Sequence, residues 1–220
     1  MNLTVPLTTL LGLTQTPGQA AGYGPLDADT ARVLACAVAG HRATRWQITV
    51  TAPDGTALAH GTAPGRTRIS VSGPAGNGPQ DSRPQGSRPQ GGRPQGSGPA
   101  AHGWTVAVTA EPVATGSCDH RRCEPGYRPS PRLQRLVRAR ASTCTAPGCR
   151  RPAAACDLDH TRGYDDDGWT CECNLAPLCR HHHRVKQTEG WQLRQPSPGV
   201  MTWTTPAGRR YTTLPSQHPT

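Results

Sequence analysis

The stretch CDLDHTRGYDDDGWTCECNLAPLCRHHHRVK, residues 156–186, holds four of the nine cysteines and four of the nine histidines in the chain. Ordinary globular segments do not concentrate thiols, imidazoles and carboxylates so densely. The stretch therefore indicates a segment that holds a metal ion, carries out chemistry, or does both. Its first part, DLDH at 157–160, alternates in the manner of a short strand, and we expect a helix to carry residues 179–184.

The composition argues against one large hydrophobic core. Only 34% of the 220 residues are hydrophobic, phenylalanine is absent, and there are 25 glycines and 23 prolines. Small domains with thin cores usually depend on a metal, disulfides or a partner. The cysteines are odd in number and, apart from Cys36, lie between residues 118 and 179 among histidines, which favours metal ligation in a reducing compartment over a disulfide framework.

Targeting signals are weak in this sequence. The apolar run LTVPLTTLLGL at 3–13 is the candidate for a signal peptide, but it lacks a basic flank and is interrupted by Thr and Pro. No stretch approaches the ~18 apolar residues that a membrane span requires. We therefore expect a soluble, cytoplasmic protein with no membrane partner.

The net charge is +10, and all but one of the 24 basic residues are arginine, the exception being Lys186. Most of the excess lies after residue 118. A concentrated positive charge indicates a polyanionic partner, because each neutralised phosphate releases counterions. A GC-rich genome would also enrich arginine, glycine and proline. Charge alone therefore leaves a nucleic-acid partner open.

Three segments precede the cysteine-rich half. Residues 27–40 predict a helix with an acidic start, residues 45–61 predict a hairpin around PDGT, and residues 102–110 alternate like a strand that could pair with this hairpin. Between them, residues 73–100 contain three copies of Arg-Pro-Gln-Gly and nothing large enough to form a core, which predicts a disordered linker.

A second helix is predicted from Ser130, a good N-cap residue that is followed by Pro131 at the first helical position. One face would carry Leu133, Leu136 and Val137. The other face would carry Arg132, Arg135 and Arg138, as either a solvated or a phosphate-contacting surface.

Two pairs of soft ligands predict a zinc site. Cys144 and Cys149 flank a Pro-Gly turn, and Cys179 and His182 are three residues apart on a predicted helix that would have Pro177 in its first turn. Together they supply the four tetrahedral ligands of a closed structural zinc site. Buried free thiols are the alternative.

Asp159 and His160 are neighbours in the predicted strand, so their side chains should point to opposite sides. One of them can bind an ion while the other acts separately. His183 follows the predicted zinc ligand His182 and projects from a different side of the helix.

These residues resemble the HNH endonucleases, which are built on the ββα-metal fold. The Asp159–His160 step, Asn174, and the Cys179, His182 and His183 run follow the order of that motif. Residues 119–220 strongly, and the first 40 residues weakly, resemble bacterial proteins in which a DUF222 or 13E12-repeat region precedes an HNH domain. The resemblance implies an α+β protein: a small ββα-metal domain with a zinc-binding knuckle and a C-terminal hairpin, after a short α/β region and the linker. The implied segments are a DUF222-like remnant at 1–72, the linker at 73–100, a connecting strand and loop at 101–129 and the nuclease domain at 130–220.

The resemblance also implies roles. His160 would be the general base that activates water, and Asn174 would tie down the loop and orient it. Asp159 and His183 would hold one catalytic Mg²⁺, Mn²⁺ or Ni²⁺. Cys144, Cys149, Cys179 and His182 would hold the structural Zn²⁺. DNA would be the partner, with backbone contacts from Arg132, Arg135, Arg138, Arg184 and Lys186.

Two features depart from the family pattern. The first zinc pair has a four-residue gap, and the last ligand is a histidine. The remaining soft ligands can form a second zinc site; they are Cys118, His120, Cys123, Cys156, Cys171 and Cys173. The three acids in YDDDGW, residues 164–169, are interpreted as solvated loop carboxylates.

The sequence thus predicts a metal-dependent HNH endonuclease that hydrolyses DNA phosphodiester bonds. The alternative is a zinc-stabilised DNA-binding module that has lost cleavage as a decayed member of a repeated family. The intact motif favours the enzyme, and the short N-terminal region favours the module.

Overall fold

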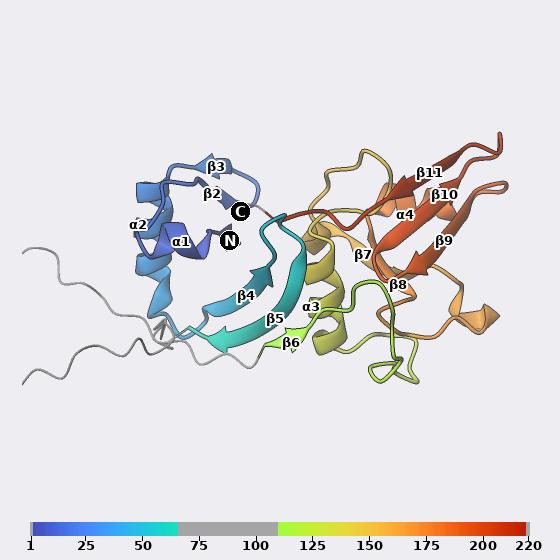
Figure 1. Ribbon diagram of the computed structural model, residues 1–220, viewed down its shortest axis with the longest axis horizontal. Helices are drawn as coiled ribbons and strands as arrows, with labels where there is room; N and C mark the ends of the chain where they lie inside the picture. Colours follow the sequence, from blue (N-terminus) through green and yellow to red (C-terminus); the bar gives the residue numbers. More distant parts are fainter. Residues whose placement is uncertain (1, 66–109, 219–220) are drawn as a thin grey trace, which may run out of the picture.

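The computed structural model describes residues 2–65 and 110–218, which adopt a mixed α/β fold with several small sheets (Figure 1). The predicted linker at 73–100 lies outside the described residues, as does nearly all of the strand predicted at 102–110.

The N-terminal part combines a three-stranded antiparallel sheet with two helices. The strands are β1 (Leu3–Thr4), β2 (Gly18–Ala20) and β3 (Gly24–Leu26), and the helices are α1 (Leu7–Leu10) and α2 (Ala28–Ala39). The Asp27 carboxylate caps α2 by accepting the backbone N–H of Thr30, which confirms the predicted helix. A Cβ on Gly18 would lie 2.8 Å from the Cβ of Ala31, so β2 approaches α2 this closely only with glycine there.

The hairpin predicted at 45–61 is confirmed as β4 (Arg45–Thr51) and β5 (Ala57–Pro64). β6 (Glu111–Pro112) adds to the other edge of β5. The chain therefore rejoins this hairpin immediately after residue 109.

Helix α3 (Pro131–Arg140) begins where the sequence predicted, with the Ser130 hydroxyl accepting the N–H of Leu133. Its three predicted core residues are buried: Leu133, Leu136 and Val137. Leu136 packs with Ala57 and Val113, whereas Leu133 and Val137 pack with Leu175. α3 therefore lies between β5 and the C-terminal part and joins their cores (Figure 1).

The C-terminal part holds a two-stranded hairpin, a short helix and a three-stranded antiparallel sheet. In chain order these are the 3₁₀ turn Ala153–Ala155, β7 (Asp157–His160), the 3₁₀ turn Tyr164–Asp166, β8 (Leu175–Leu178), α4 (Arg180–Lys186), β9 (Gln192–Ser197), β10 (Val200–Thr204) and β11 (Arg210–Thr213). The strand at 157–160 and the C-terminal hairpin are confirmed, and β9 adds a third strand to that hairpin.

The prediction that Pro177 starts the last helix is wrong. Pro177 lies in β8 opposite Leu158, and its carbonyl accepts the backbone N–H of Thr145. α4 starts three residues later, at Arg180, with Cys179 as its N-cap. Each strand of a two-stranded sheet has an unpaired edge, where a proline needs no ladder partner, so strand pairing prevailed over the local helix signal.

The largest buried cluster contains the β9–β10 residues Leu193, Met201 and Trp203 together with Leu178 and several cysteines. Apolar packing and the sulfur-rich segment thus share one core. Within the part of the chain that the structure describes, no helix is long and apolar enough to cross a membrane.

Candidate functional site

The β7–β8 hairpin and α4 position the residues of the predicted catalytic motif. Asp159 pairs with Ala176 and His160 with Leu175 across the hairpin. The Asp159 side chain contacts His183 and Lys186 of α4. The His160 side chain instead contacts the loop between the two strands. The side chains of Asp159 and His160 therefore point to different parts of the structure, as expected for neighbours in a strand.

His160 is buried, and its ring is held by a contact at one nitrogen and by a contact at one face. Its Nε2 lies 2.8 Å from the Thr170 hydroxyl, and its ring stacks on Tyr127 with centroids 5.3 Å apart. The Thr170 hydroxyl donates to the Tyr127 carbonyl, so it accepts the Nε2–H of His160. This tautomer leaves the lone pair on Nδ1. Burial lowers the pKa of His160 and keeps the imidazole neutral.

Asp157, Asp159 and His183 form a chain of polar contacts between β7 and α4. His183 Nδ1 lies 2.9 Å from Asp157 Oδ2, and His183 Nε2 lies 3.5 Å from Asp159 Oδ1. The hydrogen bond from His183 lowers the pKa of Asp157, with a further contribution from Arg180. A histidine that donates Nδ1–H to a carboxylate presents its Nε2 lone pair to a cation, so Asp159 and His183 together offer one oxygen and one nitrogen ligand.

Lys186 completes this arrangement. Its Nζ lies 2.5 Å from Asp159 Oδ2 and donates to the backbone carbonyl of His160 at 2.6 Å. The ammonium therefore fixes both the carboxylate and the end of β7. Its charge is paired within the protein, and its contact to the DNA backbone stays a prediction.

Asn174 ties down the loop that connects β7 to β8. Its side-chain oxygen accepts hydrogen bonds from the Thr161 hydroxyl and the Arg162 N–H, both at 2.8 Å, and its amide donates to the carbonyls of Arg162 and Trp169. These bonds close the loop at its base, next to His160. Among the described contacts, Asn174 affects His160 through the backbone rather than through its side chain.

The structure brings together Cys144, Cys149, Cys179 and His182. Their ligand atoms lie within 4.8 Å of one another, with His182 Nδ1 3.2 Å from Cys179 Sγ and 3.6 Å from Cys144 Sγ. A zinc tetrahedron with Zn–S bonds of about 2.3 Å and Zn–N bonds of about 2.0 Å separates its ligand atoms by roughly 3.5–3.8 Å. The spacing therefore fits a metal ion such as zinc.

The surroundings of this first cluster suit a closed site. Burial raises the pKa of Cys144 to about 12, and burial lowers the pKa of His182. Without a cation, the buried thiol keeps its proton and the imidazole stays neutral. The loop that carries Cys144 is fixed at Thr145, because the Thr145 carbonyl accepts hydrogen bonds from Trp203 and Thr213.

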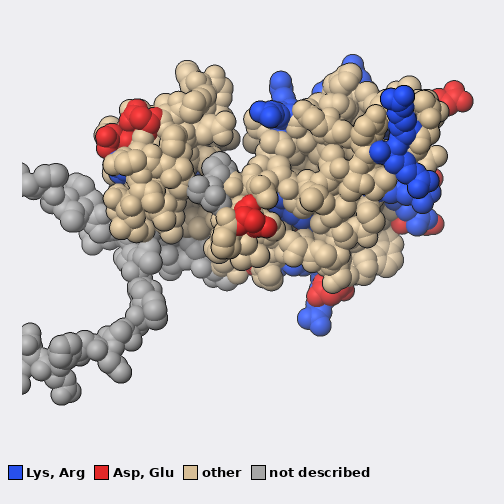
Figure 2. Space-filling model, turned by 45° about the horizontal axis from the view of Figure 1, so that its top comes forward, with Lys and Arg blue, Asp and Glu red and all other residues tan. Residues whose placement is uncertain are grey.

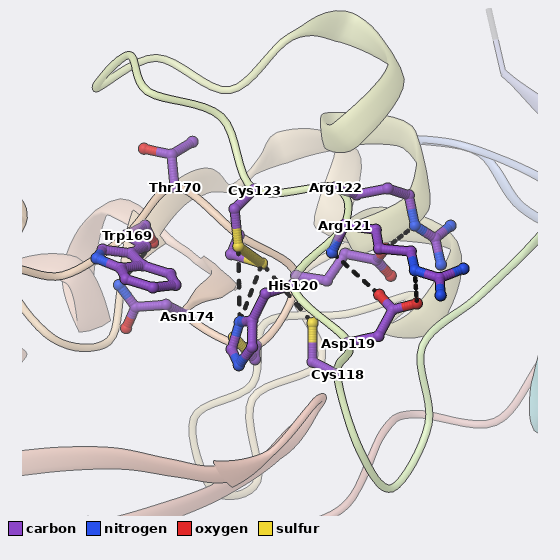
Figure 3. Close-up of a disulfide and its surroundings, with 12 residues drawn as sticks. Cys118, Asp119, His120, Arg121, Arg122, Cys123, Trp169, Thr170 and Asn174 are labelled. Atoms are coloured by element: carbon purple, nitrogen blue, oxygen red, sulfur yellow. Dashed lines mark hydrogen bonds and ion pairs between the residues drawn. A yellow bond between two sulfur atoms is a disulfide. The ribbon is translucent and has the colours of Figure 1, made fainter.

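A second cluster includes two residues of the β7–β8 loop and consists of Cys118, His120, Cys171 and Cys173, again with all ligand atoms within 4.8 Å. Cys123 forms a disulfide with Cys171. Figure 3 shows Cys118, His120 and Cys123 turned toward one another from the loop that precedes α3. The assignment of Cys156 to this cluster is wrong: Cys156 is buried beside Cys144 and Cys179, and burial raises its pKa to about 11.

The buried carboxylate of Glu172 lies in the sequence between Cys171 and Cys173, two of the three cysteines of this second cluster. Glu172 is 1% exposed; its Oε1 lies 2.8 Å from Arg122 Nε, and its Oε2 lies 3.9 Å from Nη1 of the equally buried Arg140. Arg140 also donates to the carbonyls of Glu172 and Leu175. Burial lowers the pKa of Arg140 to about 10, so it remains charged. This network joins α3 and the preceding loop to the β7–β8 loop.

Replacement of Glu172 by alanine is expected to lower the free energy of unfolding by about 3–5 kcal/mol, because Arg140 would remain buried without its counter-charge. Urea unfolding followed by circular dichroism measures the change. Glu189→Ala, which truncates an exposed glutamate in the turn after α4, is the matched control. A loss below about 1 kcal/mol, typical of an exposed ion pair, would contradict this account.

Most of the predicted basic face of α3 is engaged within the protein. Arg132 pairs with Glu111 at 2.6 Å. Arg138 donates to the carbonyls of Ala153 and Cys156 and to Gln134. Arg184 is exposed on α4. The described contacts therefore leave Arg184 as a better candidate for a phosphate contact than Arg132 or Arg138.

Three functional features were not found from the sequence. The alternation of DLDH already puts Asp157 on the same face as Asp159, and this signal could have identified Asp157 as the partner of His183. The contact of Thr170 with His160 and the pairing of Glu172 with Arg140 join residues that are distant in sequence. No local signal indicates either contact.

Comparison with known proteins gives relatives of part of the chain. The uncharacterized protein Rv3776 of Mycobacterium tuberculosis is 46% identical over 107 residues, which cover 45% of this chain and 20% of that protein. The uncharacterized proteins Rv2100 and MT2160 of the same species are each 45% identical over 93 residues, covering 42% of this chain and 17% of theirs. This chain thus spans about a fifth of the length of these relatives. No family model matches the chain, and no solved structure gives a significant match.

Proposed function

We propose that this chain is a metal-dependent endonuclease of the HNH type that hydrolyses phosphodiester bonds in DNA. The observation that carries the proposal is the arrangement at the end of β7. Asp159 and His183 approach within 3.5 Å on one side of the strand, and the neutral, buried His160 lies at the next residue on the other side. The Asp159–His160 step, Asn174 and His183 follow the order of the HNH motif, which supports the proposal.

Asp159 and His183 are the residues that would hold a divalent cation such as Mg²⁺, Mn²⁺ or Ni²⁺. One carboxylate oxygen and one imidazole nitrogen leave several coordination positions for water and phosphate, as hydrolytic sites require. The ion would supply positive charge to the phosphate and to the departing 3′ oxygen. The Asp157 carboxylate orients His183 by accepting a hydrogen bond from the Nδ1–H of His183. Lys186 holds the Asp159 carboxylate in place.

His160 is the general base in this proposal. Its Nδ1 accepts a proton from water as the water oxygen forms a bond to phosphorus and the bond from phosphorus to the 3′ oxygen breaks. The leaving oxygen takes a proton from solvent. Thr170 and Tyr127 fix the ring and the tautomer, so His160 does not need to reorient during the reaction.

Exposed arginines beside this site provide the contacts to the DNA backbone. Arg184 lies on α4 without a described side-chain partner, whereas Arg180 on α4 pairs with Asp157 and Arg162, in the loop after β7 and 66% exposed, pairs with Asp167. On the face drawn in Figure 2, basic side chains gather on the C-terminal part of the molecule and are sparse on the N-terminal part. Contacts to phosphate position the duplex without reading its sequence.

Zinc in the first cluster would be structural. Its four ligands come from the turn at 144–149 and from the start of α4, so the ion would anchor the helix that carries His183. α4 would therefore carry both a structural ligand, His182, and a catalytic ligand, His183, on different faces.

The test is nicking of supercoiled plasmid by the purified full chain with Mg²⁺, Mn²⁺ or Ni²⁺, against a matched reaction in EDTA. We expect metal-dependent conversion of supercoiled to open-circular or linear DNA, and loss of conversion in His183→Ala. Plasmid binding in a gel shift without any metal-dependent nicking would overturn the proposed endonuclease activity. It would favour the DNA-binding module instead.

Asp157→Asn is expected to weaken activation by the divalent ion about 10- to 100-fold, since the residue that orients a ligating histidine typically contributes that much. The measurement is the Mn²⁺ concentration that gives half-maximal nicking. Asp165→Asn, which neutralises an exposed carboxylate in the 164–169 loop, is the control and should leave this concentration unchanged. Equal activation curves for the two variants would remove Asp157 from the site.

A further inference from the structure

We propose that Cys118, His120, Cys171 and Cys173 hold a second zinc ion, and that the Cys123–Cys171 disulfide is the oxidised, metal-free form of the same site. The site is separate from the first cluster and from the proposed catalytic centre. It does not depend on whether the protein cleaves DNA.

The spacing of the four ligand atoms supports a tetrahedral ion. Cys118 Sγ lies 3.7 Å from Cys171 Sγ, and His120 Nδ1 lies 3.6 Å from Cys173 Sγ and 3.9 Å from Cys171 Sγ. Two of these separations fall within the roughly 3.5–3.8 Å between the ligands of a zinc tetrahedron, and the third is slightly longer. They also match the first cluster, where the corresponding sulfur-to-nitrogen distances are 3.2 and 3.6 Å.

Backbone geometry brings the ligands in as two short pairs. Cys118 and His120 come from the loop before α3, and Cys171 and Cys173 come from the loop before β8. His120 has a left-handed backbone, with φ at 59°, and its ring packs against Trp169 in a T-shaped arrangement with the ring centroids 5.5 Å apart. A non-glycine residue in this conformation persists where its surroundings fix it, and ligation of His120 supplies such a constraint.

The local charge suits this ligand set. Three thiolates and one neutral imidazole around Zn²⁺ carry a net charge of −1. Next to the site, Arg122 and Arg140 surround the single carboxylate of Glu172, which leaves a net charge of +1. The cluster is partly buried, with Cys171 buried and His120 exposed, and the neighbouring positive charge stabilises such an anionic centre.

Cys123 makes the site sensitive to oxidation. It lies 3.6 Å from His120 Nδ1 and is bonded to Cys171, so it competes with the metal for that ligand. Hydrogen peroxide is the oxidant class that we propose. The Cys123 thiol and the Cys171 thiolate give two electrons to the O–O bond and form the S–S bond. The thiol proton and one proton from solvent complete two molecules of water. Zinc then loses one of its four ligands and is released.

Zinc release also affects the β7–β8 loop, and its effect on cleavage rests on the proposed function. The Cys171–Cys173 segment leads directly into Asn174, whose amide closes the β7–β8 loop. Thr170, which holds the His160 ring, lies next to Cys171 on the other side. A change at this metal site therefore reaches Thr170, which contacts His160, and Asn174, which closes the loop.

The experiment counts zinc on the full chain purified under reducing conditions without added metal. We expect two zinc ions per chain, one ion in Cys118→Ser and in Cys173→Ser, and two ions in Cys123→Ser and in the control Cys36→Ser, which changes an exposed cysteine on α2. Retention of one zinc and of a cooperative thermal transition in Cys118→Ser distinguishes loss of this site from unfolding.

Peroxide treatment tests the second half of the proposal. The parent protein should release one zinc and form the Cys123–Cys171 disulfide, detected by peptide mass spectrometry, whereas Cys123→Ser should keep both ions. If the reduced parent holds a single zinc ion and Cys118→Ser holds the same number, the second site would be overturned. Equal zinc release from Cys123→Ser and the parent would overturn the role of the disulfide. Neither readout depends on DNA cleavage.

Discussion

Alanine in place of His160 is expected to reduce DNA cleavage by ~10²- to 10⁴-fold, the usual contribution of a general base, while zinc content and DNA binding stay at parent values. His160 contacts Thr170 and the two tyrosines 127 and 164, and no metal ligand role is assigned to it. Its removal therefore eliminates proton transfer without disturbing either cysteine cluster.

Some loss of stability accompanies this change, because the imidazole is buried and stacked. Truncation of a buried aromatic ring leaves a cavity, and we expect a cost of roughly 1–3 kcal/mol. Cleavage is therefore measured well below the melting temperature, as initial rates of plasmid nicking at saturating Mn²⁺. His181→Ala is the matched control, since His181 is exposed on α4. If His160→Ala and His181→Ala cut at the same rate, His160 is not the base.

Elements with strong local signals could be predicted from the sequence. Ser130 followed by Pro131 and three apolar residues on one face located α3, and Asp27 with Gly40 located α2. The first cluster of possible metal ligands could also be predicted, because each half of it is a short-range pair, Cys144 with Cys149 and Cys179 with His182. Local chemistry decides such features.

Features decided by long-range contacts could not be predicted. Pro177 fits the first turn of a helix, yet pairing with β7 places it in a strand. Arg132 and Arg138 are spaced like a solvent-exposed basic face, yet their partners come from other segments. Cys156 has the same chemistry as Cys171 and Cys173, and only the path of the chain puts it beside the other cluster.

Arg140 illustrates the same limit most clearly. Arg140 was not singled out from the sequence, and an arginine is rarely buried without a partner. The partner, Glu172, lies 32 residues away in a loop whose course depends on Asn174 and on the cysteines around it. Sequence periodicity describes one element at a time, so it does not reveal this pairing.

The second large effect is expected from Cys144→Ser, which should remove zinc from the first cluster and unfold the C-terminal part. Binding of zinc to a structural site of thiolates and imidazole contributes ~10 kcal/mol or more, and this free energy is part of the folding free energy. A whole domain is typically stable by only about 5–15 kcal/mol. Loss of the ion therefore removes most of the stability.

The location of Cys144 means that loss of zinc destabilises the whole C-terminal part rather than one loop. Cys144 is buried in the same cluster as Leu178, Met201 and Trp203, and the N–H of Cys179 donates to its sulfur at 3.3 Å. A serine oxygen is a poor replacement, because zinc in such sites prefers thiolate and the shorter side chain leaves the cluster open. We expect loss of one zinc, a broad thermal transition in place of a cooperative one, and secondary loss of nicking. Cys36→Ser should melt like the parent, and a Cys144→Ser protein with full zinc content and an unchanged melting temperature would show that the first cluster is a set of buried thiols rather than a metal site.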